Sequence, residues 1–206
     1  MSINIRKGER INLNKEAPGL KKAGVGLGWD ANLTDTGAAF DLDASVFMLG
    51  EDGKIPQDEY FVFYNNLLSP DAAVKHLGDS RTGEGSGDDE TIEIDLTEIN
   101  PSVQELIFVV TIHEADQRRQ NFGQVRNSFI RIYDRETDTE VTRYDLEEDF
   151  SRETSVEFGR LYKKDGEWRF QAVGEGYNAG LQSFVDKYAW FKLRDGGRFW
   201  LRLPEG

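Results

Sequence analysis

The sequence predicts a mainly β protein, a β-sandwich of two sheets with a few short peripheral helices. Many short segments rich in β-branched and aromatic residues alternate with polar residues, and Gly, Asp or Asn bounds most of them. This succession of short alternating segments and turn residues is typical of packed antiparallel sheets. With 38% hydrophobic and 12% aromatic residues in a length of 206, the composition indicates one domain with a packed core.

Eight segments are expected to form strands ahead of a hairpin. They cover residues 3–8, 23–29, 38–49, 59–66, 91–96, 105–113, 128–134 and 140–146. The hairpin covers residues 155–174, where Asp165 and Gly166 separate two alternating runs. Asp-Gly in such a position is a strong signal for a two-residue hairpin turn.

Two short helices are expected at the periphery of the sheets. In residues 69–77, Ser69 suits an N-cap and Pro70 suits the first helical position, which would leave His76 at a boundary or facing solvent. Residues 179–189 carry apolar residues at helical spacing.

The predicted domain covers residues 1–189, and residues 190–206 differ from it in character. This tail holds two Trp, two Phe and four basic residues around an Asp-Gly-Gly turn signal, and an appended hairpin is expected. Two interpretations stay open. The tail is either an extra edge hairpin or foreign segment packed on the domain, or a cationic aromatic surface for a partner or for anionic lipid.

The composition excludes several classes of function. The absence of cysteine rules out disulfides, thiolate nucleophiles and thiolate metal sites. A formal net charge of −13 disfavours binding to nucleic acid, while 38 acidic against 25 basic residues favours hard cations held by oxygen. With no run of eighteen apolar residues and no secretory signal at the start, a soluble cytoplasmic protein is expected.

A glycine-rich segment, GDSRTGEGSGDDE at residues 78–90, predicts a cation site. It lacks the Lys-Ser/Thr of a Walker loop, and three carboxylates would repel a phosphate. Glycines beside carboxylates let backbone carbonyls join acidic side chains around calcium. The alternative is a solvated acidic turn.

Calcium prefers six to eight oxygens, so further ligands are expected from other segments. In residues 40–45, FDLDAS, Asp41 and Asp43 would point to the same face of a strand, although a plain surface face is the alternative. Asp71 could instead be an acid in the first turn of a helix. The candidate ligands are Asp30, Asp41, Asp43, Asn66, Asp71, Asp79, Gly85, Asp88, Asp89 and Glu90. These acids are too numerous for one ion, and two calcium ions are expected.

Catalytic motifs find little support. His113-Glu114 resembles the start of a zinc-protease helix, but the second His would fall at position 117, which is Gln. There is no G-x-S-x-G nucleophile motif.

Several segments together resemble the TerD family of tellurite-resistance and general-stress proteins, over about residues 1–189. The segments are GLGWD, FDLDASVFML, YNNLLSPD, GDSRTGEGSGDDETIEIDL, VTIHEADQRRQNFGQVRNSFIRI and ETSVEFGRLYKKDGEWRFQAVGEGY. The resemblance implies a calcium-binding β-sandwich from bacterial operons linked to tellurite, chemical-stress and phage resistance, with cyclic-AMP-binding proteins among its relatives. Asp41, Asp43 and residues 88–90 match the family's calcium-binding segments, whereas the tail matches nothing in the family.

The leading hypothesis is therefore a non-enzymatic calcium-binding stress-response protein that acts as a sensor or scaffold. Its expected partners are proteins of a stress-response or membrane-associated complex, with recruitment to the inner face of the membrane. Two alternatives are a metal-dependent hydrolase and a calcium-dependent module that binds membranes or nucleotides.

Overall fold

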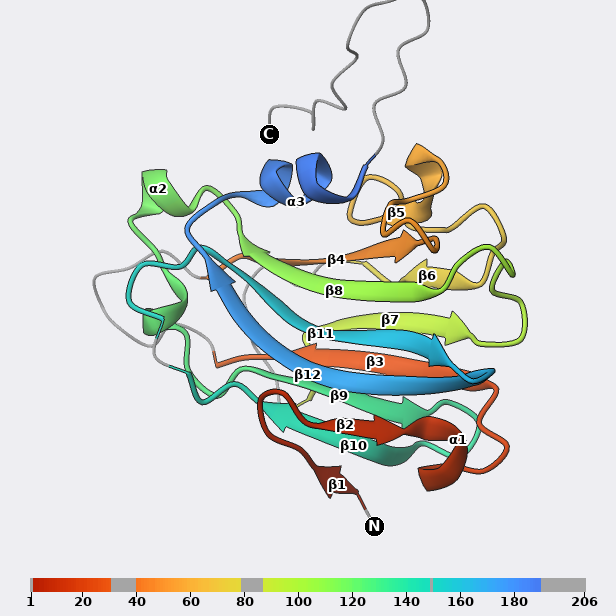
Figure 1. Cartoon of the computed structure of the whole chain (residues 1–206). Coiled ribbons are helices and arrows are strands. Elements are labelled where there is room, and N and C mark those ends of the chain that lie inside the picture. The colour runs from red at the N-terminus through yellow and green to blue at the C-terminus, as the bar shows by residue number, and fades with distance from the viewer. Residues whose placement is uncertain (1, 31–39, 79–86, 149, 190–206) are drawn as a thin grey trace, which may run out of the picture.

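The structure, a computed structural model, describes residues 2–30, 40–78, 87–148 and 150–189. Within these residues two sheets of six strands pack face to face, which confirms the predicted β-sandwich (Figure 1). Sheet A has the strand order β1-β10-β9-β3-β7-β6, and sheet B has the order β2-β12-β11-β8-β4-β5. Neighbouring strands are antiparallel, except that β1 runs parallel to β10.

The strands of sheet A are β1 (Ile3–Asn4), β3 (Lys22–Gly28), β6 (Val74–His76), β7 (Glu90–Asp95), β9 (Phe129–Asp134) and β10 (Thr139–Asp145). The strands of sheet B are β2 (Arg10–Asn12), β4 (Leu42–Leu49), β5 (Phe61–Val62), β8 (Glu105–Ile112), β11 (Ser155–Lys164) and β12 (Glu167–Tyr177). The helices are α1 (Leu13–Glu16), α2 (Ala115–Arg118) and α3 (Leu181–Tyr188), with short 3-10 turns η1 (Asp58–Tyr60) and η2 (Phe122–Gln124).

The core lies between the two sheets and is built by alternate residues of each strand. In β7, Ile92 and Ile94 are fully buried, while the alternating residues Thr91 and Glu93 are only partly buried. Strand β4 departs from this alternation, since all eight of its residues are buried. A strand buried on both faces needs a cover on its outer side.

Helix α3 supplies that cover on the outer face of sheet B (Figure 1). The Tyr188 ring lies 5.2 Å from the Phe47 ring of β4, and the Phe184 ring packs edge-on at 5.0 Å against Tyr177 of β12. The helix predicted in residues 179–189 is thus confirmed, and its apolar spacing has a structural purpose.

The predicted hairpin is also confirmed. Strands β11 and β12 pair antiparallel with Lys164 opposite Glu167, which leaves Asp165 and Gly166 as the two turn residues. Their φ angles are 56° and 77°, so both adopt the left-handed conformation that a tight hairpin turn requires.

The helix predicted at residues 69–77 is wrong. The chain makes a turn in which the Ala72 amide donates to the Ser69 carbonyl at 2.9 Å, and it then enters β6. Ser, Pro and Asp favour turns as well as helix starts, and here the β-branched Val74 is buried at the edge of sheet A. The predicted exposure of His76 is wrong for the same reason, because this side chain points inward from a strand and is 1% exposed.

The remaining strand predictions hold, with boundaries that are either shorter or, for β3, β7 and β10, shifted by one residue. In residues 59–66 the strand shrinks to the two residues of β5, preceded by η1. Strand β2 and helix α1 were not expected, since their three and four residues are too short to show a period.

Candidate cation site

Most of the predicted ligands lie where three strands begin or end. Strand β3 ends at Gly28, and its antiparallel neighbour β7 begins at Glu90, opposite Leu27. Strand β4 of the other sheet starts at the same end of the sandwich, on the left in Figure 1. The fold therefore gathers acids that are as far apart in the sequence as residues 30 and 90.

Asp30, Asp88 and Asp89 form a group that we call the carboxylate corner. The Asp89 amide donates to the Leu27 carbonyl at 2.7 Å, and the Trp29 amide donates to Asp89 Oδ2 at 2.8 Å. These two bonds fix Asp89 beside the end of β3. The pKa of Asp89 is raised, mainly by burial and further by the charges of Asp88 and Asp30, although the Trp29 hydrogen bond opposes the rise.

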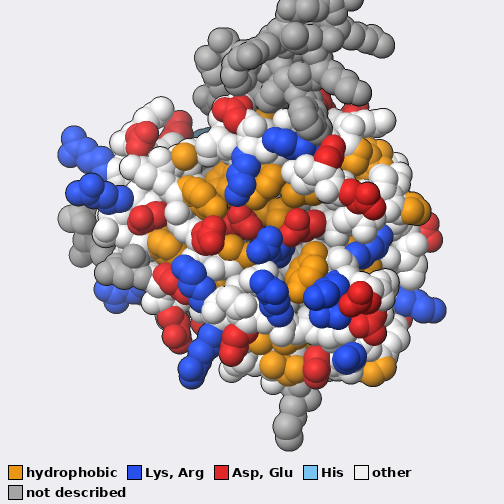
Figure 2. Space-filling view, in the orientation of Figure 1, with side chains coloured by type: hydrophobic (Ala, Val, Ile, Leu, Met, Phe, Trp, Pro, Cys, Tyr) orange, Lys and Arg blue, Asp and Glu red, His pale blue; other side chains and the backbone are white. Residues whose placement is uncertain are grey.

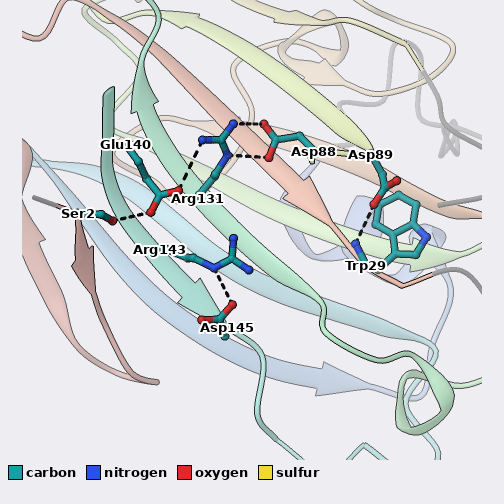
Figure 3. A network of polar contacts seen from close by, with 8 residues as sticks. All are labelled: Ser2, Trp29, Asp88, Asp89, Arg131, Glu140, Arg143 and Asp145. Atoms are coloured by element: carbon teal, nitrogen blue, oxygen red, sulfur yellow. Dashed lines mark hydrogen bonds and ion pairs between the residues drawn. The ribbon is translucent and has the colours of Figure 1, made fainter. Parts of the chain in front are cut away.

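Asp88 differs from Asp89 because it has a cationic partner (Figure 3). The Arg131 guanidinium of β9 donates to both carboxylate oxygens, from Nε at 2.7 Å and from Nη2 at 2.9 Å. Asp88 accepts these bonds as an anion, and they raise the pKa of Arg131. The negative charge of Asp88 is thus neutralised locally.

Asp41 and Asp43 lie at the start of β4 in sheet B. Asp41 precedes the strand, and its carboxylate is 3.6 Å from Arg118 Nη1 of α2. Asp43 faces outward opposite Thr111 of β8, and its Oδ2 lies 3.7 Å from His113 Nδ1. Each predicted ligand of this pair therefore has a basic neighbour of its own.

Asp43 also lines a hollow of about 310 Å³ at the N-terminal end of α3. Tyr64, His113, Glu114 and Asp116 are among the other lining residues. The pKa of Tyr64 is raised, first by burial and then by the charge of Asp43. This hollow favours positive charge, but Asp88 and Asp89 do not line it.

Glu90 faces the interior of the sandwich. Its Oε2 accepts from the Ala44 amide of β4 at 2.7 Å and lies 3.4 Å from His76 Nε2, and both side chains are 1% exposed. His76 Nε2 is in turn 3.2 Å from the Ala44 carbonyl. Glu90 and His76 thus connect sheet A to Ala44 of β4 in sheet B. Glu90, Ile92 and Ile94 are spaced two residues apart, so their side chains point to the same face of the strand. This spacing could have predicted that Glu90 points inward.

Asn66 and Asp71 do not join the carboxylate corner. Asn66 donates through Nδ2 to the Phe61 carbonyl at 2.7 Å and braces the chain around β5. Asp71 accepts from Ser69 Oγ at 2.6 Å and from the amides of Ala73 and Asn100 at 3.1 and 2.9 Å. These hydrogen bonds of Asp71 stabilise a turn near the opposite end of β7. Asp79, Gly85 and the predicted tail hairpin lie outside the described residues.

The carboxylate corner offers the type of donor that hard cations prefer, because Asp88 and Asp89 are partly buried carboxylates. Among the residues that the structure describes, however, no group of three His, Cys, Asp or Glu side chains could by itself hold a metal ion. A six- to eight-oxygen calcium shell would need further oxygens from backbone or from segments outside the described residues.

A second hollow, of about 450 Å³, lies on the outer face of sheet B and contains none of the predicted ligands. Arg10, Arg160 and Lys163 line it together with Glu51 and Glu105. Figure 2 shows this face, where basic and acidic side chains are interspersed. Arg160 already pairs with Glu105 at 3.2 Å, as expected on a solvated surface.

The fold and the corner define a β-sandwich protein with an acid-rich end. The chain belongs to the TerD family, since the family model described as the TerD domain matches residues 1–188. It is 54% identical over 188 residues to the tellurium resistance protein TerD of Serratia marcescens, covering 91% of this chain and 97% of that one. General stress protein 16U of Bacillus subtilis is 48% identical over the same shares of the two chains.

A solved structure supports the same assignment. The crystal structure of a homologue of telluride resistance protein (TerD) from Streptomyces coelicolor superposes with a TM-score of 0.64 and 25% identity, covering 81% of this chain and 96% of that one. The predicted family is therefore confirmed, and the chain is a member of a tellurium-resistance and stress-response family. In the part of the chain that the structure describes, no helix is both long and apolar enough to cross a membrane.

Proposed function

We propose that this chain is a non-enzymatic calcium-binding protein of the stress and tellurium response, and that it acts as a sensor or scaffold. It would bind two calcium ions and work through protein partners in a stress-response or membrane-associated complex. The proposal places it in the cytoplasm, with recruitment to the inner face of the membrane and no role for nucleic acid.

The carboxylate corner is the observation that carries this proposal. Antiparallel pairing of β3 with β7 brings both Asp30 and Asp88 within electrostatic reach of Asp89, and the resulting repulsion is part of what raises the pKa of Asp89. A divalent cation would relieve that repulsion. Irregular segments with carboxylate and carbonyl oxygens suit the flexible shell of calcium better than the strict octahedron of magnesium.

The role in tellurium resistance would be indirect. With no cysteine and two methionines, the chain lacks the thiols that would reduce or sequester a tellurium oxyanion. A calcium-dependent contact with other proteins is a role that such a chain can perform.

Calorimetric titration of chelator-stripped protein with calcium and with magnesium tests the proposal. We expect calcium to bind to two sites and magnesium to bind more weakly. If calcium binds only the folded state, a concentration of about 100 times its Kd should stabilise the protein by about 2.7 kcal/mol. Absence of calcium binding, or equal affinity for both ions, would contradict the proposed function.

The variant Asp89→Asn tests whether the carboxylate corner binds the calcium. Asp95→Asn, at the opposite end of β7, is its matched control. We expect the first variant to weaken calcium binding and the second to leave it unchanged. Equal effects of both variants would show that calcium responds to net charge and not to the carboxylate corner.

A further inference from the structure

The hollow of about 450 Å³ lies on the outer face of sheet B, which Figure 2 shows, and its charge balance differs from that of the whole chain. Three of its lining side chains are cationic and two are acidic, whereas the chain has 25 basic and 38 acidic residues. The sequence is thus acidic overall, but this hollow is locally basic. Its volume falls in the range of about 300–1,000 Å³ in which proteins bind small molecules.

A row of nitrogen donors crosses the floor of the hollow. Arg10 of β2 lies directly opposite Gln171 of β12, and Gln171 lies directly opposite Arg160 of β11. Directly opposite residues point to the same face of a sheet, and adjacent strands are about 4.8 Å apart. The two arginines therefore flank Gln171 with their Cα atoms about 10 Å apart, and both side chains can reach one ligand group placed over Gln171.

The hydrogen bonds of this row leave several donors available. Arg160 Nε donates to Gln171 Oε1 at 3.0 Å, and Arg160 Nη1 donates to Glu105 Oε1 at 3.2 Å, so Nη2 remains for another acceptor. Gln171 is 9% exposed, and its amide nitrogen offers two N–H groups to the hollow. Within the described part of the chain, neither that nitrogen nor the Arg10 guanidinium has a hydrogen-bond or ion-pair partner.

Lys163 adds a third cation to the lining. Its Nζ donates to the Val103 carbonyl at 3.1 Å and lies 4.9 Å from the Trp168 ring, and no described carboxylate pairs with it. Burial lowers the pKa of Lys163. An anion in the hollow would favour the charged form of this lysine.

The other half of the hollow presents acceptors and an aromatic ring. Glu51, in the turn after β4, lines it together with Gln104, Glu105 and the half-buried Tyr162. Gln104 Nε2 donates to the Pro101 carbonyl at 2.7 Å, which leaves its side-chain oxygen as an acceptor. These acceptors would repel a second anionic group, but they suit hydroxyl groups, and the ring offers apolar surface to the C–H groups of a polyol.

We propose that this hollow binds a small phosphorylated polyol of the sugar-phosphate class. The phosphate lies over Gln171 and accepts from Arg10 and Arg160, because a guanidinium matches phosphate oxygens with two parallel N–H bonds. The hydroxyl groups lie over Tyr162 and donate toward Glu51. This site is separate from the carboxylate corner and does not depend on calcium.

Calorimetric titration of the full chain tests the proposal, with chelator present so that calcium plays no part. The probes are glucose 6-phosphate, inorganic phosphate and glucose. We expect glucose 6-phosphate to bind about tenfold more tightly than inorganic phosphate, because it makes both sets of contacts, and glucose to bind most weakly. Absence of glucose 6-phosphate binding at millimolar concentration, or binding no tighter than that of inorganic phosphate, would overturn the proposal.

Arg10→Gln tests the donor row. It should weaken glucose 6-phosphate binding by about tenfold, since a charge-assisted hydrogen bond is lost. Because Arg10 is exposed and has no described partner, the variant should fold like the wild type. Arg6→Gln is the matched control, since it makes the same charge change at an exposed residue that does not line the hollow. Equal weakening by the two variants would show that phosphate responds to net charge, and the site would be refuted.

Glu51→Gln tests the acceptor half. Removing a negative charge favours any phosphate, so the informative quantity is the ratio of the affinities for glucose 6-phosphate and inorganic phosphate. We expect this ratio to fall by about threefold, because a hydroxyl loses a charged acceptor. Glu9→Gln, at an exposed acid outside the hollow, should leave the ratio unchanged. An unchanged ratio in Glu51→Gln, or an equal fall in Glu9→Gln, would contradict a polyol bound in this hollow.

Discussion

At the scale of single residues, adjacent acids in the same glycine-rich segment meet opposite electrostatic environments. Asp88 is neutralised by Arg131, whereas the pKa of Asp89 is raised by burial and by its acidic neighbours. Substituting both together would mix the loss of an ion pair with the relief of repulsion. Asp89 alone is therefore the informative position.

Asp89→Asn should raise the melting temperature at pH 7 in the presence of chelator. A carboxyl whose pKa is higher in the folded protein favours folding at low pH and opposes it once the pH rises above that pKa. The gain should therefore shrink as the pH falls toward the unfolded value of about 3.9. In excess calcium the same variant should melt below the wild type. Thermal melts across pH, with and without calcium, would measure this, and an unchanged melting temperature under both conditions at pH 7 would show a solvated acid.

Asp95→Asn should show the opposite sign at the other end of β7. Hydrogen bonds from Thr97 lower the pKa of Asp95, so its carboxylate stabilises the folded state above the unfolded pKa. We expect a lower melting temperature at pH 7 and a loss that fades as the pH falls through the lowered pKa. The same pH series measures both variants, and a loss that persists unchanged at low pH would refute the electrostatic origin.

Gly26→Ala should destabilise the protein by about 1–3 kcal/mol, because a methyl group must displace a closely packed carboxylate. Gly87→Ala is the control, since a Cβ there meets nothing within 4 Å. Urea unfolding of both variants measures the difference. Equal stability of the two variants would show that Asp88 can move aside at no cost.

At the scale of elements, the alternation of apolar and polar residues predicted the strands, and the Asp165-Gly166 turn predicted the hairpin, because both signals are local. The segment at residues 69–77 could not be resolved in this way, since Ser69 and Pro70 begin turns and helices equally well. Tertiary pairing of β6 with β7 decided its structure. The inward direction of Glu90 could be predicted from the alternation of apolar and polar residues in β7. The partner of Asp88 could not be predicted from the sequence, because Arg131 is 43 residues away.

Asp71→Ala should lower the free energy of unfolding by about 1–3 kcal/mol, because three hydrogen-bond donors lose a partly buried acceptor. Its carboxylate joins Ser69, Ala73 and Asn100 in the turn that starts β6. Because this turn is remote from the carboxylate corner, calcium affinity should not change. Denaturant unfolding and calorimetry check both statements, and a loss of calcium binding without a loss of stability would return Asp71 to the ligand set.

At the scale of the whole molecule, the described sandwich and the helix α3 that covers it are formed by residues up to 189. The family model ends at residue 188, the last residue of α3, and the Tyr188 hydroxyl donates to Glu157 of β11 at 3.2 Å. The carboxylate corner lies among strands β3, β7 and β9.

Removal of residues 190–206 should therefore leave both stability and calcium binding intact, with the free energy of unfolding within about 0.5 kcal/mol of the full chain. The tail carries four basic and two acidic residues, so the shorter chain is more negative and should attract calcium at least as well. A chain that ends at residue 180 is the contrasting control, because it loses α3 and uncovers Phe47 on sheet B. We expect it to lose several kcal/mol of stability or to fail to fold. Urea unfolding and calcium titration of the two shortened chains make the comparison, and a chain ending at residue 189 that loses calcium binding would show that the tail is part of the functional unit.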